Sequence, residues 1–176
     1  MRHSGFVYLF RATAAALALL LGACDGSADG GKVDAAGYRD IEWYAMVPKD
    51  EIEALKHPPA VDHSGSMRAQ QVQTYDTVPQ LDGQKVRLAG YIVPLEADDK
   101  GNLTEFFLVP FYGACIHVPP PPPNQIVYVK VERGVEAPEI TDPYGVKGVL
   151  RVRRTSKDLA GSAYTLEQAT IAPWQG

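Results

Sequence analysis

The feature that most constrains this chain is a run of five consecutive prolines: Pro119, Pro120, Pro121, Pro122 and Pro123. Proline has no backbone N–H and a fixed φ, so the run cannot lie inside a sheet and favours a stiff polyproline II arm. Any strand formed by residues 113–118 must end there. In an extended backbone, alternate side chains share a face, so Cys115 and His117 would project side by side. The sequence predicts a thiol–imidazole pair braced by a rigid arm.

Residues 1–23 have the features of a lipoprotein signal peptide. Arg2 and Arg11 make the start basic, a short apolar run follows, and Leu-Gly-Ala precedes Cys24. The run is too short for a comfortable membrane span. We therefore expect cleavage before Cys24 and lipidation of that residue, which would anchor the protein in the bacterial envelope facing the periplasm. Asp25 favours retention in the inner membrane. The alternative is an ordinary secretory signal with a chance cysteine.

The charge balance argues against a nucleic-acid partner. The net charge of the chain is −4, and removal of Arg2 and Arg11 with the leader makes it −6. Nucleic-acid binding requires a basic surface. Residues 24–37 are rich in glycine, alanine and aspartate, which predicts a flexible tether. The rest, residues 38–176, is expected to form a single domain.

Strand patterns dominate from residue 81 onward. Apolar alternation and apolar runs predict strands over residues 85–96, 104–111, 125–131, 146–153 and 163–171. A short N-terminal helical segment is expected over residues 50–57 because Pro58 and Pro59 end it. A change of alternation after Gly90 predicts a bulge or bend. The expected fold is mainly β, a small five-stranded OB-fold-like Greek-key barrel, with a β-sandwich as the alternative.

The Cys-x-His pair suggests a transition-metal site. Thiolate and imidazole are preferred ligands of Zn²⁺ and also suit copper. Zinc needs at least three protein ligands, and the further candidates are His57, His63, Glu96, Asp98 and Glu105. The alternative is structural: Cys115 would behave as a small buried hydrophobic residue beside a hydrogen-bonded histidine.

The Cys–His pair and the proline arm each have a further interpretation. A Cys–His pair can support nucleophilic catalysis, but side chains at positions i and i+2 of a strand lie parallel, so no enzyme is expected here. Lipidation of Cys24 would also leave no second cysteine for dithiol exchange at Cys115. The proline arm is either a docking surface for a partner protein or an internal brace that folds back on the domain.

Three segments carry a resemblance to a known family. Residues 86–96 (VRLAGYIVPLE), 105–111 (EFFLVPF) and 113–129 (GACIHVPPPPPNQIVYV) resemble the bacterial family called domain of unknown function 3299, as does the segment 41–48 (IEWYAMVP). The resemblance implies a secreted or lipid-anchored envelope protein that accompanies ABC-transporter components, some of them linked to zinc. It implies no enzymatic activity.

Overall fold

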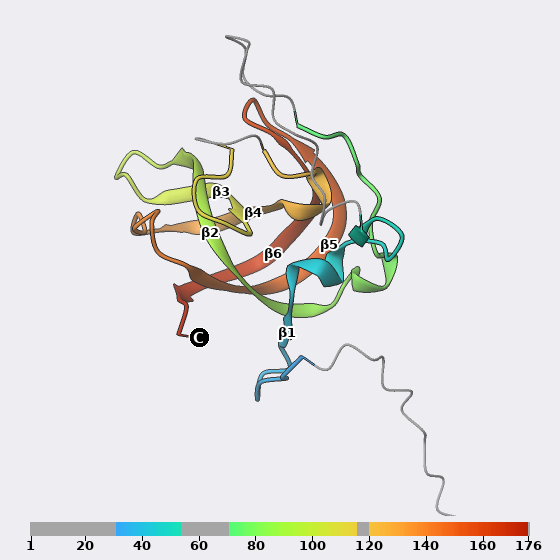
Figure 1. The fold of residues 1–176 in the computed structure, drawn as a ribbon. Coiled ribbons are helices and arrows are strands. Elements are labelled where there is room, and N and C mark those ends of the chain that lie inside the picture. Colours follow the sequence, from blue (N-terminus) through green and yellow to red (C-terminus); the bar gives the residue numbers. More distant parts are fainter. Residues whose placement is uncertain (1–30, 54–70, 116–119, 176) are drawn as a thin grey trace, which may run out of the picture.

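The computed structural model describes residues 31–53, 71–115 and 120–175 (Figure 1). Its strands are β1 (Arg39–Ile41), β2 (Lys85–Ala97), β3 (Leu103–Val109), β4 (Val127–Val135), β5 (Tyr144–Ser156) and β6 (Gly161–Pro173). Three single 3-10 turns accompany them: η1 (Trp43–Met46), η2 (Pro79–Leu81) and η3 (Pro123–Gln125). The predicted mainly β class and its five strands are confirmed as β2 to β6. The short strand β1 was not predicted.

The predicted helix over residues 50–57 falls mostly outside the described residues. Only Ile52 and Glu53 have helical conformation within them, and residues 54–57 are not described. The complete helical elements of the described chain are the three 3-10 turns.

The strands form one closed barrel with an extra strand at its edge. The order is β1-β2-β3-β4-β6-β5, and β2 also pairs with β5, which closes the ring. β4 and β6 run parallel, whereas the other neighbouring pairs of the ring are antiparallel. β1 adds to β2 in parallel. A meander of three strands, followed by a fourth that returns beside the first, is the predicted OB-fold-like Greek key.

Gly90 is the point at which β2 changes partner. Residues Lys85 to Gly90 pair with β5, and pairing with β3 begins at Tyr91. A Cβ at Gly90 would lie 2.6 Å from the backbone oxygen of Val109, so only glycine permits this close crossing. The predicted change of side-chain alternation after Gly90 is wrong, because Leu88 and Ile92 both face the core. The irregular pairing of β2 lies further on, between Pro94 and Ala97.

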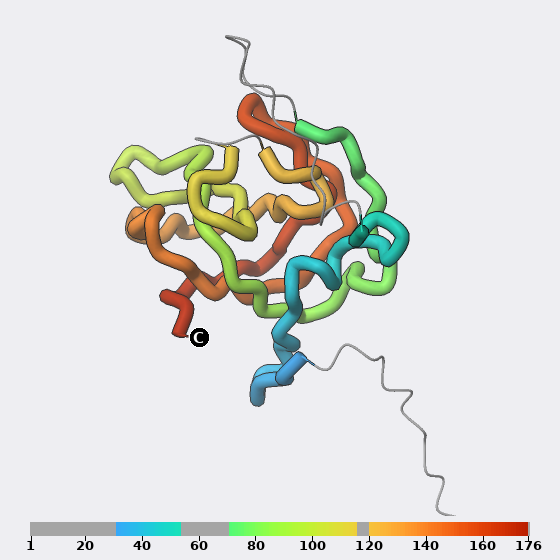
Figure 2. Tube along the Cα trace, viewed as in Figure 1, coloured from blue at the N-terminus to red at the C-terminus, as the bar shows by residue number. Residues whose placement is uncertain are grey.

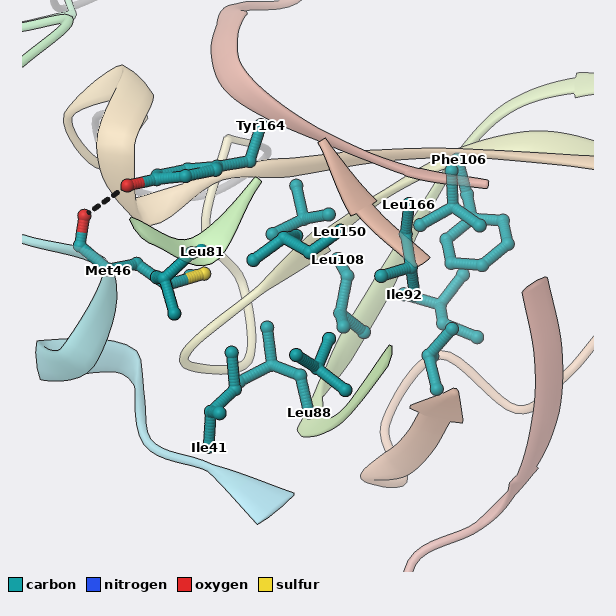
Figure 3. Packing of buried hydrophobic residues seen from close by; sticks show 14 of the residues in the cluster. Ile41, Met46, Leu81, Leu88, Ile92, Phe106, Leu108, Leu150, Tyr164 and Leu166 are labelled. Atoms are coloured by element: carbon teal, nitrogen blue, oxygen red, sulfur yellow. Dashed lines mark hydrogen bonds between the residues drawn. The ribbon is translucent and has the colours of Figure 1, made fainter. Parts of the chain in front are cut away.

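The barrel interior is filled by residues from all five barrel strands, mostly at alternate positions (Figure 3). Tyr164 of β6 is fully buried, and its hydroxyl donates to the Met46 carbonyl at 2.7 Å and accepts from the Val78 N–H at 2.8 Å. Burial raises the pKa of Tyr164 to about 12. Because Met46 belongs to η1, these bonds hold the N-terminal segment against the barrel.

Residues 31–37, the end of the predicted tether, are attached to the barrel. Val33 forms an isolated bridge with Arg39, and the Asp34 carboxylate accepts from the backbone of Ala36 and Tyr38. Asp34 also lies 2.5 Å from the Lys147 ammonium of β5. Residues 31–37 of the predicted tether therefore contact β1 and β5 in the folded domain.

Candidate functional site

The segment between β3 and β4, residues 110–126, lies over the outside of the barrel (yellow in Figure 2). We call it the covering loop; residues 116–119 within it are not described. Beneath it is a second hydrophobic cluster, the outer cluster, formed by Val93, Phe107, Val109, Ala114, Cys115, Ile126 and Ala160. Phe107 and Val109 are the residues of β3 that point away from the core. This burial on both sides explains the continuous apolar run of β3.

The covering loop occupies the surface with which OB-folds usually bind ligands. In that fold, the second and third barrel strands and two neighbouring loops form the binding face. The corresponding strands here are β3 and β4, and one of those loops joins β5 to β6 and contributes Ala160 to the outer cluster. The chain itself therefore covers the β3 part of this face, whereas Tyr128, Lys130 and Glu132 of β4 line an open surface groove.

Cys115 does not lie on an extended strand. Residues 112, 113 and 115 form a turn, and Cys115 has a φ of 67°, in the left-handed region that non-glycine residues rarely adopt. The turn places consecutive residues, Ala114 and Cys115, in the same apolar cluster, with Cys115 only 3% exposed. The predicted alternation from residue 113 is wrong for these residues, because β3 ends at Val109 rather than continuing. His117 lies outside the described residues.

Glu105 of β3, a predicted candidate ligand, belongs to a charged cluster beside the outer cluster. Its carboxylate is bonded by Lys130 Nζ at 2.9 Å and by Lys157 Nζ at 2.6 Å. Burial raises the pKa of Glu105, but the hydrogen bonds from Lys157, Lys130 and Tyr128 outweigh it and lower the pKa to about 2. Two ammonium groups at one carboxylate repel a metal cation, so this arrangement suits an internal ion pair.

Tyr128 completes this cluster from β4. Burial, together with the neighbouring Glu105 carboxylate, raises the pKa of Tyr128 to about 12. The Lys157 ammonium lies 5.4 Å from the centre of the Tyr128 ring. Lys157 thereby attaches the loop between β5 and β6 to the outer face of β3 and β4. Sequence reasoning missed Lys157 because its partners are distant in the chain.

Of the other candidate ligands, Glu96 is the cross-strand neighbour of Glu105 and shares its partner Lys157, whereas Asp98 lies apart in a hairpin. Glu96 lies 3.4 Å from Lys157, and Asp98 closes the hairpin between β2 and β3 by accepting from the backbone N–H groups of Lys100 and Asn102. His57 and His63 lie outside the described residues. Within residues 31–53, 71–115 and 120–175, no group of three His, Cys, Asp or Glu side chains could hold a metal.

The proline arm is largely buried. Pro120, Pro121 and Pro123 are buried, and Pro122 is half-buried. Gln71 donates to the Pro121 carbonyl at 2.8 Å. This burial favours the internal brace over an open docking surface for the described prolines; Pro119 is not described.

Two buried amides follow the prolines and fasten the covering loop. Asn124 donates to Glu51 at 2.9 Å and to the Asp76 carbonyl at 3.0 Å. Gln125 donates to the Trp43 carbonyl at 2.9 Å. Both link the loop to segments that precede the barrel. Sequence reasoning did not single them out, although two amides directly after a run without N–H donors are a usable signal.

Two consecutive aromatic side chains stand exposed where the covering loop begins. Phe111 is 45% exposed and Tyr112 is 50% exposed. The Tyr112 ring lies 6.2 Å from the Tyr91 ring of β2, centre to centre. Aromatic groups of this kind are enriched at protein interfaces.

The fold and site define a class of protein: an OB-fold-like barrel whose usual ligand face is partly covered by its own loop. A family model described as "Protein of unknown function (DUF3299)" matches residues 43–173. The chain belongs to this family. It is similar to a DUF3299 family protein from Pseudomonas aeruginosa PAO1 known from a 2.45 Å crystal structure, with 37% sequence identity and a TM-score of 0.62. That match covers 80% of this chain and 99% of the other.

No curated protein shows significant similarity to the chain. Among the residues that the structure describes, no helix is long and apolar enough to span a membrane. The predicted lipidation site, Cys24, lies outside those residues.

Proposed function

We propose that the protein is a lipid-anchored accessory protein of the bacterial envelope that binds a partner protein in an ABC-transporter system. Cys24 would carry the lipid, and the domain would face the periplasm, with Asp25 favouring the inner membrane. The transporter association rests on the family resemblance. No enzymatic role is proposed.

One observation supports binding through protein contact: the β3 part of the usual OB-fold ligand face is covered by the chain itself, while Phe111 and Tyr112 stand exposed at its edge. Large aromatic side chains provide contact area at low conformational cost, and they often carry much of the binding energy of an interface. The buried Pro120 and Pro121 would support this edge from within rather than contact the partner.

Site-specific photocrosslinking in native envelopes tests this function. A photoreactive residue replaces Tyr112 in one variant and Tyr44 in the control, because Tyr44 is similarly exposed at 56% but belongs to η1. We expect position 112, and not position 44, to crosslink to a component of an ABC transporter. Equal crosslinking at both positions, or a product of another class at position 112, would contradict the proposal.

A second candidate function is metal handling, with Zn²⁺ bound by Cys115 and His117. The observation that favours it is the left-handed φ of Cys115, because strained non-glycine residues cluster at functional sites. Since Glu105 is engaged by two lysines, further ligands would come from His57 or His63. Metal analysis of the mature protein and a Cys115→Ser, His117→Ala variant tests this idea. Equal zinc and copper contents would exclude it.

A further inference from the structure

The position of the lipid anchor restricts how the barrel can face the bilayer. This inference rests on the proposed lipidation of Cys24, which lies seven residues before Gly31, where the described chain begins. Seven residues span at most about 25 Å even when fully extended. A domain of this size is roughly 35 Å across. The anchor therefore excludes orientations in which the side of the barrel that carries Gly31 is the side farthest from the membrane, and it favours those in which that side faces the membrane.

That side, here called the anchor face, is basic in an acidic protein. It comprises residues 31–41, 85–87, 142–147 and 170–175, which meet around β1 and the C-terminal end of β6 (Figure 1). Its basic residues are Lys32, Arg39, Lys85, Arg87 and Lys147, against three acidic residues, Asp34, Asp40 and Asp142. The net charge of the anchor face is +2, whereas that of the whole chain is −4. Because Arg87 and Lys147 form ion pairs with Asp40 and Asp34, this excess comes from Lys32, Arg39 and Lys85 against Asp142.

Aromatic rings lie among these cations. The ammonium groups of Lys85 and Lys147 lie 5.6 and 5.7 Å from the centre of the Tyr38 ring. The Arg87 guanidinium lies 5.0 Å from the Trp174 ring, and Arg87, Lys147 and Trp174 line a shared surface groove. Tryptophan and tyrosine favour the boundary between lipid headgroups and acyl chains.

We propose that the anchor face binds the anionic phospholipid headgroups of the bilayer in which the lipid is inserted. Basic side chains near an anionic leaflet are attracted to it, by roughly fivefold in affinity for each charge. The anchor holds this face beside the membrane, so a patch too weak to bind alone is sufficient. The barrel then has a fixed orientation, which leaves Phe111 and Tyr112 at a defined position relative to the membrane.

The test uses the mature lipoprotein in vesicles that contain brominated acyl chains, which quench nearby tryptophans. Vesicles contain phosphatidylcholine alone or mixed with phosphatidylglycerol. The difference in signal between wild type and Trp174→Phe isolates the quenching of Trp174. A Lys32→Glu, Lys85→Glu variant removes charge from the anchor face. The control, Lys100→Glu with Arg133→Glu, makes the same charge change at exposed positions near the opposite end of β2.

We expect strong quenching of Trp174 only with phosphatidylglycerol, lost at high salt because the charges are screened. The Lys32→Glu, Lys85→Glu variant should reduce the fraction of molecules whose anchor face contacts the bilayer, measured by Trp174 quenching, by roughly tenfold or more. The control variant should match wild type. Equal quenching in both lipids, or equal losses in both variants, would overturn the proposal. Flotation with the vesicles reports the anchor separately: failure to float in either lipid would overturn lipidation, and this inference with it.

Discussion

β3 separates two hydrophobic clusters that are held together in different ways. On its inner side, Phe106 and Leu108 belong to a core to which all the barrel strands contribute by regular alternation. On its outer side, Phe107 and Val109 are covered by an irregular loop. The core forms wherever the strands pair in register, whereas the outer cluster depends on a few side-chain bonds that hold its cover. The outer cluster should therefore be the weaker and more easily opened of the two.

The largest expected effect compares adjacent positions of β3. Phe106 and Phe107 are both fully buried, one in each cluster. Phe106→Ala should lower the free energy of unfolding by about 4–5 kcal/mol, because the closed ring of strands cannot collapse into the cavity. Phe107→Ala should cost about 3 kcal/mol, because the covering loop can relax. Denaturant unfolding measures both, and an equal or larger loss for Phe107→Ala would refute the comparison.

The second prediction concerns the ion pairs of Glu105. Its pKa is lowered from 4.5 to about 2 in the folded protein, so its stabilisation is complete above pH 4.5 and is lost as the pH falls toward 2. The loss should be about 3 kcal/mol. Unfolding free energies measured between pH 5 and pH 2 should therefore converge for wild type and Glu105→Gln as the pH falls. A constant difference over this range would count against a charged Glu105.

The inner half of this structure follows from the sequence, and the outer half largely does not. Alternation of apolar and polar residues, as at Val86 and Leu88, indicates a strand with one face in a core. The same logic fails at Cys115, because β3 ends at Val109, ten positions before the first proline of the run, rather than continuing to it. The prolines correctly predicted a segment outside the sheet. Of the two alternatives for it, the internal brace that folds back on the domain agrees with the burial of Pro120, Pro121 and Pro123.

The candidate site illustrates the same limit. Glu105 was identified as a possible ligand from its residue type, but its chemistry is set by Lys157, which is 52 positions away. No local pattern predicts which distant lysine reaches a buried carboxylate. Ion pairs across a barrel become predictable only when strand order and register are known.

The third prediction compares two glutamines on 3-10 turns. Gln125 of η3 is buried and donates to the Trp43 carbonyl, whereas Gln80 of η2 is exposed. Gln125→Ala should lower the free energy of unfolding by about 2 kcal/mol, because a carbonyl loses its partner beneath the cover. Gln80→Ala should change it by less than about 0.5 kcal/mol. Thermal unfolding measures both changes. Similar losses of stability in the two variants would mean that the Gln125 amide does not fasten the covering loop.

The smallest expected effect on stability separates opening of the cover from unfolding of the core. Alkylation of Cys115 in the native protein requires the outer cluster to open, because the residue is 3% exposed. Lys157→Met keeps the apolar part of the side chain but removes one cation from Glu105. It should lower the free energy of opening the outer cluster by about 1 kcal/mol, which speeds alkylation of Cys115 roughly fivefold. Lys130→Met removes the other cation, which is 64% exposed, and should have less effect. Mass spectrometry of the peptide that contains Cys115 gives both rates. If alkylation of wild type and both variants follows the global unfolding equilibrium instead, the two clusters open together, and the covering loop is as much a part of the core as the strands are.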